Sequence, residues 1–156
     1  MNTFIWLNVL GPSKRNPSVP EIAFFATISR HDLSNLGEEQ VLLFDNVRYN
    51  VGNAYNGRHG SFTAPVDGTY VFHVTLACMT FLRDAQYAFL YVNDEAMYGF
   101  LLHNPLQSSQ MLVYRLRVGD EVLVKNTYVG DAVYGFTWST FSGFLLYAHS
   151  EAAIVG

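Results

Sequence analysis

The stretch FDNVRYNVGNAYNGRHGSFTAPVDGTYVF, residues 44–72, decides the fold of this chain. Its large aromatic residues are separated by turns rich in asparagine and glycine, which are poor helix formers. The segment GTYVFHV at residues 68–74 alternates large apolar side chains with mixed ones, which is the period-two pattern of a β-strand. Residues 44–72 are therefore predicted to form short strands joined by turns. The aromatic positions are Phe44, Tyr55, Phe62, Tyr70 and Phe72.

The rest of the chain from Glu21 also has the pattern of strands and turns. No helix of ten residues with an apolar stripe can be drawn anywhere in it. Asn93-Asp94 and Gly119-Asp120 mark tight turns, and each is predicted to join two strands as a hairpin. Many short strands at this spacing favour a β-sandwich or jelly roll. The predicted strands span residues 22–29, 41–44, 70–79, 85–92, 96–100, 111–118, 121–129 and 141–148, with loops at 30–40, 81–84, 101–109 and 130–138.

The chain length of 156 residues suits one domain, which needs neither a disulfide nor a metal to fold. Residues 1–20 are predicted to be a leader or linker. Within them, residues 4–10 are apolar but too short to span a bilayer and lack a preceding positive region. The prolines that follow indicate an extended segment. We place the domain at residues 21–149 and a tail at residues 150–156.

Charged residues make up 14% of the chain, against about 25% in a typical soluble domain. The formal net charge is −4 and the lysines and arginines are scattered, so no basic stripe exists to follow a phosphate backbone. Nucleic-acid binding and membrane insertion are therefore not expected. The single cysteine, Cys78, lies in an apolar run on the same face as Tyr70 and Phe72, and it is predicted to be a buried thiol.

Two predicted strands are apolar on both faces. In residues 86–92, three aromatic residues alternate with Ala88, Leu90 and Val92, and residues 141–147 behave in the same way. A two-layer sandwich buries only one face of each strand, so loops or a neighbouring subunit must cover the other. Packing three such surfaces around an axis would bury them, which favours a trimer.

The aromatic, asparagine and glycine residues between positions 44 and 74 resemble, in their order and spacing, the signature of the globular C1q domain. This domain is the head of the C1q and tumour-necrosis-factor superfamily. The last signature position departs, because Val74 stands where an aromatic residue is usual. Three further segments resemble strands of that family in the same order, namely residues 22–26, 116–122 and 139–147, and the likeness covers residues 21–149. After Phe44, the matching signature positions are Asn50, Tyr55, Phe62, Gly68, Tyr70 and Phe72.

This resemblance implies an all-β, ten-stranded jelly-roll sandwich, a homotrimer, secretion to the extracellular space and non-catalytic recognition. Gly68 and Gly143 would mark places of tight backbone approach. The sequence has no Gly-X-Y repeat, so recruitment of proteases through a collagen stalk is not expected. The resemblance also implies that Phe44, Phe62, Tyr70, Phe72, Phe141 and Phe144 fill or flank the core.

Several members of this family bind calcium through carboxylates in the loop before the strand that resembles LRVGD. In this chain the loop spans residues 101–109 and carries no carboxylate. Calcium requires six to eight oxygen ligands, some of them acidic. We therefore expect no cofactor and no family-type calcium site, although Asn104 and backbone carbonyls could contribute oxygens. Asp94 and Glu95 are adjacent carboxylates, which a hairpin turn would leave solvated.

An enzymatic function is not expected. His31, Asp32 and Ser34 form the one compact cluster that resembles a catalytic triad, but it stands in a polar segment without a Gly-x-Ser-x-Gly elbow. The five histidines lack metal-ligand spacing, and no glycine-rich phosphate loop or paired-cysteine zinc motif is present. His73 is predicted to point outward as a structural or interface residue.

The segment at residues 130–138 is the first candidate binding site. Its aromatic residues Tyr134, Phe136 and Trp138 stand at alternate positions, so an extended backbone would show them on one side. Exposed aromatic rings stack on sugars or anchor protein partners. In the alternative interpretation these rings cap the sandwich or pack at a three-fold axis.

The segment at residues 53–59 is the second candidate site. It contains Tyr55, Arg58 and His59, of which Arg58 is suited to an anionic group such as phosphate or sialic acid. Two function classes follow from the resemblance. The first is a soluble pattern-recognition protein that binds microbial polysaccharide or lipopolysaccharide, with avidity from trimerisation. The alternative is a secreted signalling ligand for a cell-surface receptor, and the sequence does not distinguish between the two.

Overall fold

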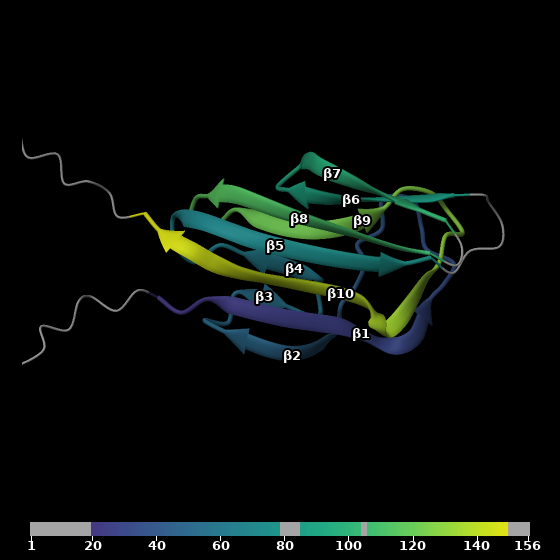
Figure 1. Ribbon diagram of the computed structural model, residues 1–156, viewed down its shortest axis with the longest axis horizontal. Coiled ribbons are helices and arrows are strands. Elements are labelled where there is room, and N and C mark those ends of the chain that lie inside the picture. Colours follow the sequence, from purple (N-terminus) through teal and green to yellow (C-terminus); the bar gives the residue numbers. More distant parts are fainter. Residues whose placement is uncertain (1–19, 79–84, 104–105, 150–156) are drawn as a thin grey trace, which may run out of the picture.

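Two antiparallel five-stranded sheets face each other in a β-sandwich (Figure 1). The computed structural model of the chain describes residues 20–78, 85–103 and 106–149. Sheet A has the strand order β2-β1-β10-β5-β8, and sheet B has the order β3-β4-β9-β6-β7. This architecture confirms the predicted all-β jelly roll. The strands are β1 (Ala23–Leu33), β2 (Asn46–Val51), β3 (Tyr55–Asn56), β4 (Ser61–Thr63), β5 (Gly68–Ala77), β6 (Gln86–Val92), β7 (Glu95–Leu102), β8 (Gln107–Leu116), β9 (Glu121–Asn126) and β10 (Val133–Ala148).

The aromatic residues of the sequence 44–72 form the centre of the core. The ring of Phe24 stacks on that of Tyr55 with centroids 4.4 Å apart, and the edge of Phe141 packs against it at 4.9 Å. Edge-to-face and offset contacts of this kind stabilise aromatic clusters beyond the burial of their area. The predicted core positions Phe44, Phe62, Tyr70, Phe72 and Phe141 are fully buried, and Cys78 is buried as well.

Phe144 is an exception to the predicted core. Its side chain is 45% exposed, because it lies on the face of β10 that points away from sheet B. The two glycines behave as predicted. A Cβ on Gly143 would lie 2.5 Å from the Phe72 ring, and one on Gly68 would lie 2.5 Å from the carbonyl oxygen of Tyr147. The sheet therefore leaves no room for a side chain at either position.

The first part of the domain differs from the predicted strand boundaries. β1 continues to Leu33, beyond the predicted end at residue 29. Residues 41–44 do not form a strand of their own, because they make one bridge, Val41 with Lys125, before the chain crosses to sheet A as β2. The amide of Leu42 donates to the carbonyl of Val124 at 2.8 Å during this crossing. Only Val41 and Leu42 contact β9 here, which is too few residues to form a further strand of sheet B.

The predicted hairpin of residues 111–118 with 121–129 is wrong. The chain does turn at residues 117–120, where the Asp120 amide donates to the Arg117 carbonyl at 3.0 Å. However, β8 pairs with β5 in sheet A, whereas β9 pairs with β4 and β6 in sheet B. The turn therefore carries the chain from one layer of the sandwich to the other. The sequence pattern of a tight turn is the same whether the turn joins two paired strands or connects the two sheets.

Two predicted loops are shorter than expected. The segment 101–109 is largely strand, since β7 ends at Leu102 and β8 begins at Gln107. The segment 130–138 is mostly the beginning of β10, which starts at Val133. The predicted strand end at residue 79, the turn at 81–84, and the leader and tail at 1–19 and 150–156 lie outside the described residues.

The outer face of sheet A divides into two zones. One zone, the apolar patch, is a set of exposed hydrophobic side chains that lie on neighbouring strands. Beside it, five polar residues in register cross the sheet and form the polar row, in which Asn46 donates to Thr27 at 3.0 Å and the hydroxyls of Thr75 and Ser109 are 2.6 Å apart. The apolar patch consists of Phe25, Tyr49, Met111, Val113 and Phe144, and the polar row of Asn46, Thr27, Thr140, Thr75 and Ser109.

Candidate functional site

The predicted aromatic residues of the first candidate site lie at the beginning of β10. Trp138 is 60% exposed and Phe136 is 48% exposed, whereas Tyr134 is half-buried. The imidazole of His31, from the end of β1, meets both Tyr134 and Phe136 edge-on, with ring centroids 6.0 and 5.9 Å apart. The structure thus places the three predicted residues around a histidine from the neighbouring strand.

The backbone at this point is irregular, which explains how the side chains are presented. Phe136 has a positive φ of 49°, an uncommon conformation for a bulky residue. The register between β1 and β10 shifts twice between Thr27 and Asp32. A Cβ on Gly135 would collide with the carbonyl oxygen of Arg30, so a glycine is needed where the two strands meet so closely. Figure 1 shows the bend of β10 near its start.

Tyr134 and Trp138 line one hollow of about 410 Å³, which we call the aromatic hollow. Phe136 does not line it, although its ring meets the imidazole of His31. The prediction that alternate spacing puts all three rings on one side therefore holds for two of them. The wall is completed by His31, Ala77, Leu106 and Gln107.

Two polar residues of the aromatic hollow were missed from the sequence. Gln107 donates from Nε2 to the carbonyl oxygen of Trp138 at 2.9 Å, which fixes the edge strand β8 against β10. His31 contributes its ring to the wall. Both residues fall in segments that the sequence pattern assigned to loops, so only the strand order β1-β10-β5-β8 in sheet A brings them together.

Asp32 follows His31 in β1 but does not line the aromatic hollow. Its carboxylate lies 3.1 Å from Nδ1 of His31, and hydrogen bonds from His31 and Ser34 hold the pKa of Asp32 below its ordinary value. Ser34 therefore bonds to the carboxylate, whereas a catalytic triad needs the serine beside the histidine. The geometry of this cluster positions His31 and keeps Asp32 ionised.

The second candidate segment, residues 53–59, borders an open hollow of about 700 Å³ that Arg58 also lines. Asn56 organises it, since its side-chain oxygen accepts the amide of Arg58 at 3.0 Å and its Nδ2 lies 3.3 Å from Nδ1 of His59. Asp45 lines the same hollow, so a negative charge stands in it with Arg58. The arrangement is a surface turn held by side-chain hydrogen bonds.

Tyr55 is largely a core residue, although it also lines the second hollow. Its side chain is 4% exposed, its ring stacks on Phe24, and its hydroxyl donates to the carbonyl oxygen of Phe44 at 3.1 Å. Burial raises the pKa of the Tyr55 hydroxyl, so the group stays protonated. Asn50 also bonds to the backbone of Tyr55 at 2.8 Å, so the residue anchors its turn.

No group of three or more histidine, cysteine, aspartate or glutamate side chains is close enough to hold a metal within the described ranges. In those same parts of the chain, no helix is long and apolar enough to cross a membrane. The absence of a family-type calcium site stays a prediction, because residues 104–105 of the loop that would carry it lie outside the described residues.

Residues 23–146 match the sequence profile of the C1q domain. The chain belongs to the C1q domain family. Among relatives of this C1q domain, the heavy metal-binding protein HIP of Mytilus edulis is 35% identical over 135 residues, which cover 81% of this chain. Human complement C1q tumor necrosis factor-related protein 3 is 32% identical over 138 residues, or 84% of this chain. The chain spans 61% and 53% of the length of these two relatives.

Solved structures place the C1q domain in the same fold. The globular domain of the zebrafish complement 1qA protein aligns with a TM-score of 0.66 at 18% identity, covering 83% of this chain and 99% of that one. The tumour-necrosis-factor protein Eiger of S. frugiperda aligns with a TM-score of 0.68 at 14% identity, covering 86% of this chain and 98% of that one. These likenesses confirm the jelly roll shared by the C1q and tumour-necrosis-factor proteins.

Proposed function

We propose that this C1q domain belongs to a secreted, non-catalytic recognition protein that binds microbial surface polysaccharide or lipopolysaccharide through the aromatic hollow. The exposed ring of Trp138 beside Tyr134 in a hollow of about 410 Å³ carries the proposal. Aromatic rings stack on the apolar faces of sugars, and two rings in one hollow provide such a surface. The volume is suited to one or two sugar rings.

The rim of the aromatic hollow has the polar groups that sugar hydroxyls need. His31 lines the hollow and contributes ring nitrogens at its edge. Gln107 retains its side-chain oxygen as an acceptor while its Nε2 holds the backbone of Trp138. A stacking ring with acceptors at its edge favours a neutral, hydroxyl-rich ligand.

We also propose that the domain is a homotrimer held by the apolar patch on sheet A. The polar row lies between that patch and the aromatic hollow, and its hydrogen bonds satisfy several of its side chains. This arrangement supports a division of sheet A into an assembly surface and a binding surface. Three copies of a weak site would then act together on a repetitive polysaccharide.

The alternative function is that of a signalling ligand for a cell-surface receptor. The 32% identity with human complement C1q tumor necrosis factor-related protein 3 favours it. A protein partner would use the same exposed aromatic residues as anchors. The two functions differ in their ligand, so binding to purified glycan separates them.

A binding measurement on Trp138→Ala tests the glycan proposal. The variant should lose about 10-fold or more of its affinity for immobilised microbial polysaccharide, since a stacking ring contributes on the order of 1–2 kcal/mol. Its melting temperature should change little, because the indole is 60% exposed. Glycan arrays followed by titration calorimetry supply the measurement.

Tyr147→Ala is the matched control. Tyr147 is an aromatic residue of the same strand with 64% exposure, but it lies far from the aromatic hollow in β10. It should leave glycan binding unchanged. If Trp138→Ala unfolds the domain or dissociates the trimer, the indole is structural and the proposal fails. If no glycan binds but a receptor ectodomain does, the signalling function replaces it.

A further inference from the structure

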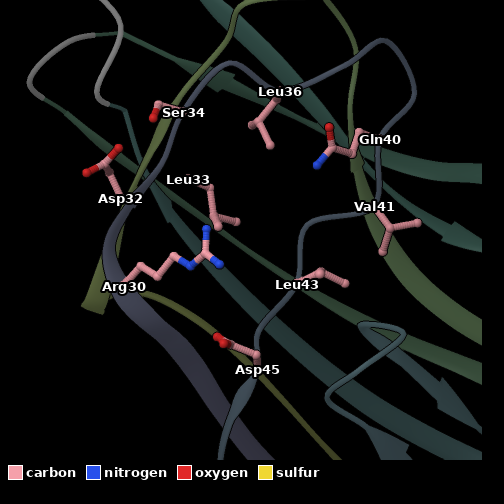
Figure 2. A pocket seen from close by; sticks show the side chains of 9 residues that line it. All are labelled: Arg30, Asp32, Leu33, Ser34, Leu36, Gln40, Val41, Leu43 and Asp45. Carbon is pink, nitrogen blue, oxygen red and sulfur yellow. The ribbon is translucent and has the colours of Figure 1, made fainter.

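A second hollow lies on the other side of the end of β1, and we call it the arginine hollow. It encloses about 230 Å³ between the end of β1 and the segment that leads to β2 (Figure 2). Arg30 and His31 are successive residues of β1, so their side chains point to opposite sides of the strand. The aromatic and arginine hollows are therefore separate. The arginine hollow is lined by Arg30, Asp32, Leu33, Ser34, Leu36, Gln40, Val41, Leu43 and Asp45.

The guanidinium of Arg30 occupies the middle of this hollow. Figure 2 shows it reaching between Leu33 and Leu43. Among the described residues, none forms a hydrogen bond or an ion pair with it, in contrast to Arg115, which is paired with Asp67 at 3.1 Å. The Arg30 guanidinium thus presents a planar set of N–H donors to a cavity.

Gln40 points a second set of donors into the same hollow. Its side-chain oxygen accepts the amide of Gly37 at 2.7 Å, which fixes the orientation of the side-chain amide. With the oxygen held in this way, Nε2 faces the guanidinium of Arg30 across the hollow, as Figure 2 shows. Two groups from different segments therefore offer N–H donors to one space.

The two carboxylates at the rim are already bonded to other groups. Asp45 accepts the amide of Ser29 at 2.8 Å and its hydroxyl at 2.5 Å. Asp32 is held by His31 and Ser34. Burial alone would raise the pKa of Asp45, but the hydrogen bonds from Ser29 prevail, so the pKa of Asp45 lies below its ordinary value. Both groups stay ionised, and the charge of Arg30 also contributes to the lowered pKa of Asp45, although among the described residues no salt bridge joins Arg30 to either carboxylate.

We propose that the arginine hollow binds the carboxylate of a small ligand, with Arg30 as a two-pronged donor and Gln40 as a second donor. Arginine and carboxylate match in planar, bidentate geometry. The ionised side chains of Asp32 and Asp45 at the rim penalise additional negative charge. The hollow therefore selects a group with one negative charge over a phosphate with nearly two.

The walls limit the body of this ligand. Leu33, Leu36, Val41 and Leu43 border the donors, so the atoms next to the carboxylate meet apolar side chains. A volume of about 230 Å³ admits one ring or one branched chain. A compact carboxylic acid can come from a sugar acid such as glucuronate or from a branched aliphatic acid such as isovalerate, and both carry the same recognised group.

Nuclear magnetic resonance titration of the isotopically labelled full chain with glucuronate and with isovalerate tests this proposal. At least one acid should give saturable shifts for residues of the arginine hollow, with a dissociation constant on the order of millimolar for so small a ligand. Saturation by glucuronate alone identifies the sugar acid as the source, and saturation by isovalerate alone the aliphatic acid. Glucose, which lacks the carboxylate, should give none.

Arg30→Gln should weaken the binding of the responding acid by about 10- to 100-fold, which is the range for loss of a charge-assisted hydrogen-bond pair. Arg30→Lys, which keeps the charge but not the fork, should recover only part of it. Arg48→Gln removes another exposed arginine with the same charge change and should bind normally. The proposal is overturned if neither acid binds, if Arg48→Gln weakens binding equally, or if phosphate binds more tightly than the acids.

Discussion

At the beginning of β5, the carboxylate of Asp67 takes two hydrogen bonds from the guanidinium of Arg115, at 3.3 and 3.1 Å. The hydrogen bond from Arg115 holds the pKa of Asp67 below its ordinary value, with smaller effects from the charges of His149 and Arg117. The same pair raises the pKa of Arg115. Because both side chains lie largely in solvent, the pair is a modest contributor to stability that salt weakens.

The pair predicts a specific acid dependence of stability. The pKa of Asp67 is lower in the folded chain than its unfolded value of about 3.9, so its contribution is complete above that pH and is lost as the pH falls through the folded pKa. The difference in melting temperature between the wild type and Asp67→Asn should therefore be present at pH 6 and shrink below about pH 4. Thermal unfolding over a pH series measures it.

Arg115→Gln provides the control for this prediction. Once the arginine is removed, the further change Asp67→Asn should have little effect at any pH, because the principal cause of the lowered pKa has gone. An Asp67→Asn effect that persists unchanged in the Arg115→Gln background would show that the pair is not its origin.

The structural roles of some single residues could be predicted from the sequence. The resemblance to the C1q signature implied a buried Phe44 and a close backbone approach at Gly143, and the structure confirms both. The burial of Tyr55 was not predictable, because it depends on a stacked ring from Phe24, which is far away in the sequence. His31 was visible only as a member of a false triad, since its aromatic partners come from β10.

At the scale of strands, the close contact between β1 and β10 positions side chains of both the aromatic hollow and the arginine hollow. The carbonyl oxygen of Arg30 approaches Gly135 so closely that a methyl group cannot be inserted without separating the strands. On one side of this contact His31 enters the aromatic hollow, and on the other side Arg30 enters the arginine hollow. A change in this contact should therefore be detected in both.

Gly135→Ala should destabilise the domain by about 3 kcal/mol or more, because the obstacle is backbone rather than a movable side chain. Gly119→Ala is the comparison, since Gly119 has a φ of 90° but nothing within 4 Å of an added Cβ. It should cost only about 1 kcal/mol, from the backbone conformation alone. Denaturant unfolding of both variants measures the two free energies.

Glycan binding provides the second measurement on these variants. Gly135→Ala should weaken it even at temperatures where the domain is folded, because Tyr134 and Trp138 move with the strand. Gly119→Ala should leave it unchanged. Equal destabilisation by the two substitutions would mean that the strand contact is less tight than described.

Strand existence was largely predictable and strand partners were not. The period-two pattern located β5, β6 and β7 within a few residues. The positions of β8 and β9 in different sheets depend on which layer has room after the turn at 117–120, and that is a property of the whole sandwich. The beginning of β10 escaped prediction because its glycine and aromatic residues have the composition of a loop, while pairing with β1 makes it a strand.

At the scale of the whole molecule, the apolar patch on sheet A is the surface that most needs a partner. Phe144 lies near its centre, opposite Ala23 of β1 and Val71 of β5, and is 45% exposed in the single chain. The sequence predicted an exposed apolar face on two strands, and the exposure of Phe144 confirms it for residues 141–147, whereas residues 86–92 form β6 in sheet B and lie outside the apolar patch. The number of subunits that cover it is a property of several chains, so it stays a proposal.

Phe144→Arg tests the proposed trimer. The wild type should have three times the mass of one chain in light scattering at micromolar concentration, and the variant should have the mass of one chain, because each interface would bury an unpaired charge. Tyr87→Arg is the matched control on sheet B, where Tyr87 is 41% exposed, and it should remain a trimer. A wild type with the mass of one chain would refute the proposal.

The described domain begins and ends at the same end of the sandwich, where β1 starts and β10 finishes, while both hollows lie at the opposite end (Figure 1). The molecule consequently has a polarity that an experimenter can use. A tether attached before residue 20 or after residue 149 would hold the domain upright on a sensor chip, with its hollows toward the flowing sample. Immobilisation through randomly chosen side chains would turn the hollows of some molecules toward the chip. Protein tethered at either end should therefore show the higher fraction of molecules able to bind.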